Sequence, residues 1–314
     1  MIKYLHFFII SLLCCPGLSA QDENNVPYKQ SKKLSLALHK IVKDLSLDSV
    51  FFVGEDGTAK IGITVIDLNG KKPVYGGLNI ADFIYPASVY KMYVAMEVLK
   101  QVSNGRLSLA QSYIVPTHNA VDKSREISFD PRPLLQAGDT VTINYLLDLM
   151  ITRSDNSAAN CLIDLATRKS INETMHQNGW VGSDVTRKFL KRTLEDPGYD
   201  SIRSTVTSAA HAAEFLYKIQ QGQLVNPWVS QQMKALLGRQ LDNAKLAAGL
   251  PPNVMFYHKT GWWSYYTHDV GIVDDGRIKY IIAVFSPLKE EDANPKLKLL
   301  SSKVYDLIKN FHSR

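Results

Sequence analysis

A lone lysine stands in an otherwise apolar stretch of this chain, three residues after a serine. In the segment IYPASVYKMYVAM, residues 84–96, Lys91 is the only charged residue and Ser88 precedes it. Residues three apart share one face of a helix, so the amine can reach the hydroxyl. Burial favours the neutral amine, which can take a proton from serine and turn the hydroxyl into a nucleophile.

Both residues also have ordinary interpretations. A serine before an apolar helical run commonly caps the helix, and a lysine commonly extends its charged end to the surface. The pattern S-x-x-K is short, and a second copy occurs at Ser286 and Lys289, at a strand end with no buried helix behind it. Taken alone, the first copy is equally compatible with a nucleophilic role and a structural role for Ser88.

Two further motifs favour the chemical interpretation. Ser154-Asp155-Asn156 lies between two predicted helices, and Lys259-Thr260-Gly261 lies on a predicted strand. The order S-x-x-K, S-D-N, K-T-G is characteristic of one group of serine acyl enzymes. Over about residues 35–312 the chain resembles the class A β-lactamases and the related penicillin-recognising serine hydrolases.

The resemblance implies a role for each motif residue. Ser88 would be the nucleophile that opens an amide or lactam carbonyl, Lys91 would help to take its proton, and Ser154 would protonate the departing nitrogen. The backbone N–H groups of Ser88 and Trp262 would form the oxyanion hole. The residues implied to bind the substrate are Asn156, Lys245, Lys259, Thr260, Gly261 and Trp262.

Some of these assignments have competing interpretations. Lys245 occupies the place of an arginine that steadies the substrate carboxylate in many relatives, but a solvated lysine at a helix end fits the sequence equally well. Gly261 is expected to let the strand approach a ligand closely. Four aromatic residues near the K-T-G motif could wall an apolar pocket or belong to the core: Trp262, Trp263, Tyr265 and Tyr266.

The chain departs from the family pattern where the acyl-enzyme must be hydrolysed. Class A β-lactamases activate the hydrolytic water with a glutamate in an E-x-x-L-N stretch, whereas here Val185-Thr186-Arg187 is followed by KFLKRTLEDPGYDS. Glu195 is the nearest candidate for this catalytic base, and Asp196 aligns with a recurrent acid of the related hydrolases. A solvated loop residue is the alternative for Glu195, and without a base turnover would stall after acylation.

The elements around the motifs predict an α+β fold, arranged as an α/β sandwich. Strand patterns occur at residues 59–77 and in three segments between 255 and 286, with helical patterns between them. We expect an antiparallel sheet built from both chain ends and flanked by helices, with an all-helical subdomain inserted at about residues 87–220. The hydrolase domain is expected to cover residues 35–314.

The first twenty residues have the pattern of a secretory signal peptide. Lys3 precedes an apolar run, and small residues lead to Ala20. A flexible lead-in is expected at residues 21–34, and lipidation of Cys14 or Cys15 is less well supported because neither cysteine follows a small residue in the expected Leu-x-x-Cys arrangement. We therefore expect a secreted or periplasmic protein without a membrane span, in which Cys161 has no partner for an intrachain disulfide.

Composition further limits the classes of function that we expect for this chain. Removal of Lys3 would lower the net charge from +6 to +5, and the interleaved charges give little support to nucleic-acid binding. No metal-ligand spacing is found, so we expect neither a metal nor a cofactor. The sequence predicts a monomeric exported enzyme that opens a β-lactam or acts on a peptidoglycan-like small molecule. The alternatives are a DD-peptidase, an esterase-like serine hydrolase and a penicillin-binding module without efficient deacylation.

Overall fold

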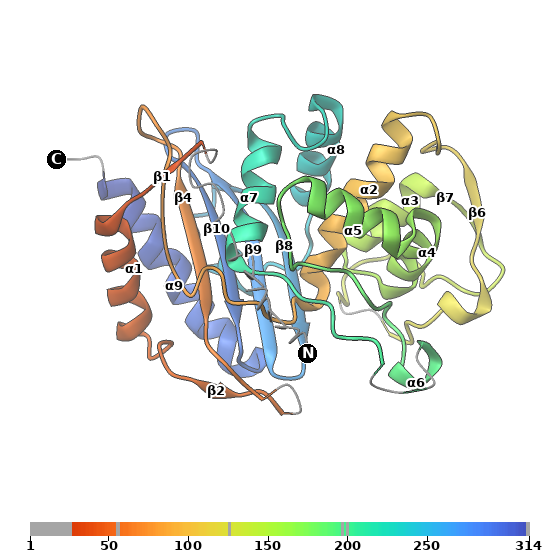
Figure 1. Cartoon of the computed structure of the whole chain (residues 1–314), viewed down its shortest axis with the longest axis horizontal. Coiled ribbons are helices and arrows are strands. Elements are labelled where there is room, and N and C mark those ends of the chain that lie inside the picture. The colour runs from red at the N-terminus through yellow and green to blue at the C-terminus, as the bar shows by residue number, and fades with distance from the viewer. Residues whose placement is uncertain (1–26, 55–56, 125–126, 196–197, 199–200, 312–314) are drawn as a thin grey trace, which may run out of the picture.

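The computed structural model describes residues 27–54, 57–124, 127–195, 198 and 201–311. Its centre is a six-stranded sheet in the order β1-β5-β4-β10-β9-β8 (Figure 1), in which only β1 and β5 pair in parallel. The strands are β1 (Lys29–Gln30), β4 (Gly62–Asp67), β5 (Val74–Leu78), β8 (Met255–Trp263), β9 (Tyr266–Asp274) and β10 (Lys279–Ser286). Both chain ends therefore contribute to one sheet, which confirms the predicted α+β fold.

Helices cover both faces of the sheet. On one face lie α1 (Lys32–Asp44) and α9 (Glu290–Phe311), whose apolar sides share a buried cluster with the strands. On the other lies α7 (Ala209–Gln220), followed outward by the helical block (Figure 1). The helices of this block are α2 (Lys91–Ser103), α3 (Ile143–Thr152), α4 (Asn156–Ala166), α5 (Arg168–Gln177) and α8 (Pro227–Leu237).

The central helix of the block is α2, which accounts for the apolar run around Lys91. It contacts α3, α4, α5 and α8, and ten of its residues are buried. The buried carboxylate of Glu97 accepts hydrogen bonds from Thr174 Oγ1 and Gln101 Nε2, so its burial is compensated. The apolar stretch around Lys91 is thus a central buried helix, and every buried polar group on it needs a specific partner.

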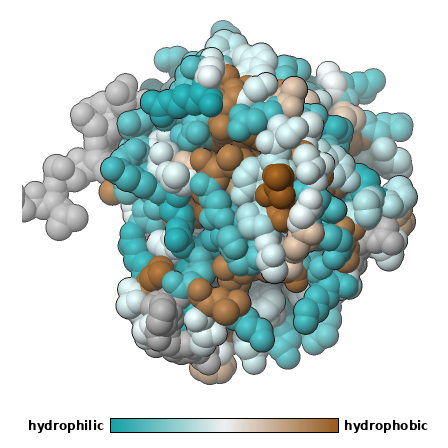
Figure 2. All heavy atoms as spheres, turned by 90° about the vertical axis from the view of Figure 1, so that its right-hand side faces the viewer, coloured by the Kyte–Doolittle hydropathy of each residue, from teal (hydrophilic) through white to brown (hydrophobic). Residues whose placement is uncertain are grey.

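The remaining elements are short. Two small antiparallel pairs flank the main body, and the side of the molecule that carries β6 and β7 is largely hydrophilic (Figure 2). These elements are β2 (Phe51–Phe52), β3 (Thr58–Ala59), β6 (Ser112–Ile114), β7 (Thr140–Thr142), α6 (Arg192–Glu195) and the 3-10 turns η3 (Ala87–Tyr90), η4 (Thr117–Asn119) and η5 (Leu246–Gly249). Within the described ranges, no helix is both long and apolar enough to cross a bilayer.

The N-terminal predictions have different outcomes. The signal peptide predicted at residues 1–20 lies outside the described residues. The flexible lead-in predicted at 21–34 is wrong in its last part, because β1 pairs with β5 and α1 begins at Lys32. The Ser31 hydroxyl caps this helix by accepting the N–H of Leu34 at 3.2 Å. The partner strand lies far along the chain, so local composition could not reveal the pairing.

A buried histidine links the sheet to the segment that precedes Ser88. The N–H of Ser286 donates to His268 Nδ1 at 3.1 Å, so Nε2 carries the proton and donates to the carbonyl oxygen of Tyr85 at 2.9 Å. Burial lowers the pKa of His268 to about 4, so the ring is neutral in the folded protein at neutral pH. The neutral ring therefore tethers residue 85 to β9 and β10.

This tether predicts a pH dependence of stability. Unfolded His268 binds a proton near its ordinary pKa, whereas the folded side chain does so only near 4. Stability is therefore lost as the pH falls, by about 2 kcal/mol in the free energy of unfolding between pH 7 and pH 5. Urea unfolding of wild type and His268→Gln at both pH values measures this, because the variant lacks the contribution. Equal pH dependence in the two proteins would contradict the assignment.

Candidate active site

Ser88 and Lys91 lie at the junction between η3 and α2. Ser88 belongs to the 3-10 turn and Lys91 is the first residue of the α-helix. A 3-10 helix has three residues per turn, so residues three apart lie above one another. Ser88 is 8% exposed while Lys91 is fully buried. The turn thus places Ser88, which lines the cavity, on the same side as a buried amine.

The Lys91 amine lies among oxygen acceptors from the S-D-N motif. It donates to Asn156 Oδ1 at 2.8 Å, to Ser154 Oγ at 3.2 Å and to the Ser154 carbonyl oxygen. Ser154 itself adopts a left-handed conformation with φ of 63°, which costs a non-glycine residue about 1 kcal/mol. The strained turn between α3 and α4 therefore directs both a hydroxyl and a carbonyl at one amine.

The middle residue of the S-D-N motif has a structural role. Asp155 caps α4 by accepting the N–H of Ala158 at 2.7 Å, and its other oxygen accepts Arg153 Nη2 at 2.8 Å. Burial, and then the nearby Asp122 carboxylate, raise the pKa of Asp155. This cap begins α4 immediately after Ser154 and so fixes the direction of the two flanking motif residues.

The K-T-G motif brings a second lysine to the same hydroxyl. Lys259, on β8, is fully buried and donates to Ser154 Oγ at 3.0 Å and to the Thr260 carbonyl oxygen at 2.8 Å. The Ser154 hydroxyl therefore stands between Lys91 and Lys259. A hydroxyl in this position can take a proton from one amine and pass a proton onward, which is the role that the resemblance implied.

Gly261 is required by the packing of β8 against the turn that holds Ser88. A Cβ at this position would lie 2.9 Å from both the Pro86 carbonyl oxygen and the Ser88 nitrogen, and 3.0 Å from the Val89 nitrogen. The close approach that the sequence suggested is therefore to the turn that holds Ser88. A side chain here would displace the nucleophile.

Lys245 is absent from the cavity lining. It is fully buried and forms ion pairs with Asp242 at 2.6 Å and Glu290 at 2.7 Å. Burial alone would lower its pKa, but these carboxylates raise it. The structure places the Lys245 charge between two acids instead of on the surface that opens at Ser88.

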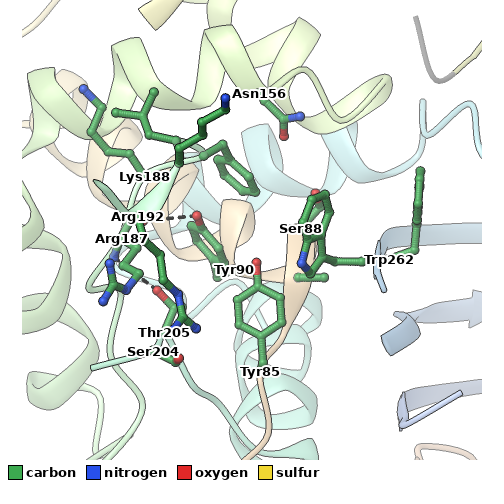
Figure 3. A pocket seen from close by; sticks show the side chains of 15 residues that line it. Tyr85, Ser88, Tyr90, Asn156, Arg187, Lys188, Arg192, Ser204, Thr205 and Trp262 are labelled. Carbon is green, nitrogen blue, oxygen red and sulfur yellow. Dashed lines mark hydrogen bonds between the residues drawn. The ribbon is translucent and has the colours of Figure 1, made fainter. Parts of the chain in front are cut away.

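A cavity of about 430 Å³ opens at Ser88 (Figure 3). Its lining comes from residues 85–90, 187–192, 204–205 and 262–263, together with Asn156. The indole of Trp262 lies beside Ser88, opposite the arm that carries Arg187, Lys188 and Arg192 (Figure 3). The cavity can therefore hold a small molecule whose reacting carbonyl lies at Ser88.

The four aromatic residues near the K-T-G motif divide into two pairs. Trp262 and Trp263 line the cavity and are 40% and 62% exposed. Tyr266 is buried, with its ring 5.6 Å from that of Tyr85, and Tyr265 lies under the Lys289 ammonium. The two tryptophans are thus the residues of this set that are placed to contact a ligand.

Phe189 is a site residue that the sequence reasoning missed. Its ring lies 4.2 Å from Lys91 Nζ and stacks on Tyr90 at a centroid distance of 4.8 Å. The buried side chain of Asn160 holds its backbone by accepting the Phe189 N–H at 2.8 Å and donating to its carbonyl oxygen at 3.3 Å. Its one signal in the sequence is an aromatic residue among the charges of KFLKR, which does not reveal its contact with Lys91.

Glu195 lies in a different environment from the one expected of a catalytic base. Its Oε1 accepts the N–H of Lys188 at 2.8 Å and Arg168 Nη1 at 3.1 Å, and its side chain is only 4% exposed. It is absent from the cavity lining, and it anchors the segment that carries Phe189. The other candidate, Asp196, lies outside the described residues.

The family model for the beta-lactamase enzyme family matches residues 42–308. The chain belongs to this family. Among curated proteins it is similar to the β-lactamase AST-1 of Nocardia asteroides, 27% identical over 250 residues, which cover 77% of this chain and 76% of the relative. The extended-spectrum β-lactamase PER-1 of Pseudomonas aeruginosa is 26% identical over 245 residues, covering 72% and 74%. This confirms the resemblance to class A serine β-lactamases.

Solved structures of the β-lactamase fold superpose on nearly the whole chain. PBP-A has a TM-score of 0.73 at 19% identity, covering 91% of this chain and 99% of that one. A mutant of PBP-A, solved as an acyl-enzyme complex with penicillin G, has a TM-score of 0.74, also at 19% identity. At this identity the structures establish the fold that the family members share.

The packing of Gly261 gives a prediction for this β-lactamase-like site. Gly261→Ala would bring a methyl group against the backbone of Ser88, so the turn must shift. We expect roughly a tenfold to hundredfold loss of acylation rate, because small displacements of a nucleophile are costly. The rate is measured by intact mass spectrometry during reaction with a β-lactam.

The matched control is Gly62→Ala in the central strand β4. A Cβ there would meet no heavy atom closer than 3.4 Å, so the nucleophile stays in place. Equal acylation rates for Gly261→Ala and Gly62→Ala would show that the contact with Ser88 is unimportant.

Proposed function

We propose that this chain is an exported, monomeric serine hydrolase that opens β-lactams and peptidoglycan-like amides by acylating Ser88, and that it releases the acyl group slowly. The slow release of the acyl group is supported by the contact of Phe189 with Lys91, together with the burial of Glu195 against Arg168. Two curated relatives named β-lactamases support ring opening. The slow release favours the penicillin-binding alternative over an efficient β-lactamase.

The acylation step follows from the positions of three side chains. Ser88 Oγ attacks the carbonyl carbon, and its proton passes to Lys91, which accepts it in its neutral form. The carbon–nitrogen bond then breaks, and the nitrogen takes the proton of Ser154 Oγ, which Lys91 restores across 3.2 Å. The Lys259 charge on the far side of Ser154 Oγ favours an anionic substrate. The product of this step is an ester on Ser88, and the protonated amine stays attached to it when the substrate is a β-lactam and departs when the substrate is an open-chain amide.

Deacylation needs a water molecule and a base that removes its proton. On the side of residues 187–192 the group against Lys91 is the phenyl ring of Phe189, which can neither accept a proton nor orient water. Glu195, the acid of this segment among the described residues, does not line the cavity and already accepts hydrogen bonds from Lys188 and Arg168. The ester on Ser88 is therefore expected to persist.

Intact mass spectrometry with benzylpenicillin tests the first part of the proposal. The wild-type protein should gain the mass of one penicillin molecule, and Ser88→Ala should gain none. The complete absence of an adduct on the wild type, with the substrate also unconsumed, would overturn the assignment of Ser88.

Replacement of the phenyl ring tests the second part. Phe189→Glu would place a carboxylate where the ring meets Lys91, because Asn160 holds the backbone of residue 189 and not its side chain. We expect the hydrolysis of the acyl-enzyme to accelerate by roughly tenfold or more, since general bases contribute factors of this size or larger. Phe189→Leu is the control that removes the ring without adding a base, and an equal gain in both variants would contradict the explanation.

A complementary prediction concerns Glu195. Because its carboxylate anchors the segment around Lys188, Glu195→Gln should lower the melting temperature by a few degrees and leave the hydrolysis rate of the ester within about threefold of wild type. Thermal unfolding and decay of the mass adduct measure the two effects. A hundredfold slower hydrolysis in a folded variant would identify Glu195 as the base after all.

A further inference from the structure

Asp122 makes a set of contacts at the site that the catalytic roles described so far do not use. It follows η4 in the connection between β6 and β7. Its Oδ2 accepts the N–H groups of Asn156 at 2.8 Å and Ser157 at 2.9 Å, and its Oδ1 accepts Asn156 Nδ2 at 2.9 Å. One carboxylate therefore holds both the backbone and the side chain of Asn156.

The position of Asp122 is itself fixed by the residue after Asn156. The buried Ser157 hydroxyl accepts the N–H groups of Val121 at 2.9 Å and Asp122 at 3.1 Å. It donates in turn to Asp122 Oδ2 at 3.2 Å. The clamp formed by Asp122 and Ser157 is thus closed on both sides before any ligand binds.

These contacts fix the orientation of the Asn156 amide. Its Oδ1 faces the Lys91 amine at 2.8 Å, while Nδ2 faces the Asp122 carboxylate. A flipped amide would direct Nδ2 at an amine that donates and Oδ1 at a carboxylate that only accepts, and both contacts would be lost. Nδ2 carries two hydrogens, and Asp122 takes one of them. Asn156 lines the cavity (Figure 3), so the second hydrogen can serve a ligand.

We propose that Asp122 is a positioning residue that holds Asn156 ready to donate its remaining amide hydrogen to a carbonyl on the acyl side of the substrate. This inference rests on the proposed acylation of Ser88. It makes Asp122 a determinant of specificity for substrates that carry an amide carbonyl next to the bond that is opened. Asp122 acts through Asn156 and does not touch the substrate.

The test uses two penicillins with the same ring system. Benzylpenicillin carries an acylamido carbonyl beside the lactam, and 6-aminopenicillanic acid carries an amine instead. In Asp122→Asn the new amide can no longer accept from all four donors of residues 156 and 157, so the Asn156 amide is free to turn. The second-order rate of acylation should fall about tenfold for benzylpenicillin, the upper end for one hydrogen bond between neutral groups, and less than threefold for 6-aminopenicillanic acid.

Two further variants separate positioning from simple damage to the fold. In the Asn156→Ala background, Asp122→Asn should leave the ratio of the two acylation rates unchanged, because the residue that it orients is gone. Asp139→Asn, which also removes a carboxylate that accepts a backbone N–H in the same connection, should leave the ratio at the wild-type value. If Asp122→Asn does not fold, Ser157→Ala loosens the clamp from its other side and should lower the benzylpenicillin rate preferentially.

The failure of this inference differs from the failure of the proposed function. If neither penicillin acylates the wild-type protein, the function of Ser88 is wrong. If both penicillins acylate it and the folded Asp122→Asn protein loses rate equally for the two, the function stands and Asp122 is only structural.

Discussion

Two fully buried lysines that converge on one serine hydroxyl are the constraint on which the rest of the structure depends. Lys91 and Lys259 come from a helix and a strand far apart in the sequence, and they donate to Ser154 Oγ at 3.2 and 3.0 Å. A buried ammonium is costly unless it is hydrogen-bonded. The left-handed turn at Ser154, the cap at Asp155 and the missing side chain at Gly261 all serve to bring oxygen acceptors and the nucleophile to these amines.

The same constraint explains why much of the site could be predicted from the sequence. A lysine in an apolar helix, a serine three residues before it and two short motifs each lie on one local element. Few other kinds of chemistry fit this combination of residues. The helix that is buried on all sides and the strands after residue 255 follow from hydrophobic pattern alone. The pairing of β1 with β5 does not follow from the hydrophobic pattern, because tertiary packing determines which strand β1 meets.

The residues whose surroundings sequence reasoning could not foresee are those that depend on a distant contact. Lys245 has the right charge for a substrate carboxylate, yet Asp242 and Glu290 enclose it. In the sequence Phe189 is an ordinary loop aromatic. In the structure Asn160 of α4 holds its backbone, and its ring lies against the Lys91 amine. Glu195 is the acid nearest in sequence to the expected base, but it is buried against Arg168 and does not line the cavity. Such contacts join segments whose spacing carries no periodic signal.

The central claim is that Ser88 is acylated readily and that its acyl group is released slowly. The reason is that a phenyl ring lies against Lys91 in the place of a base. A stopped-flow measurement with a chromogenic cephalosporin tests it most directly. The account predicts a burst of about one equivalent of opened ring per protein, followed by a steady rate at least a hundredfold slower. Fast, linear turnover with no burst, at saturating substrate, would contradict it.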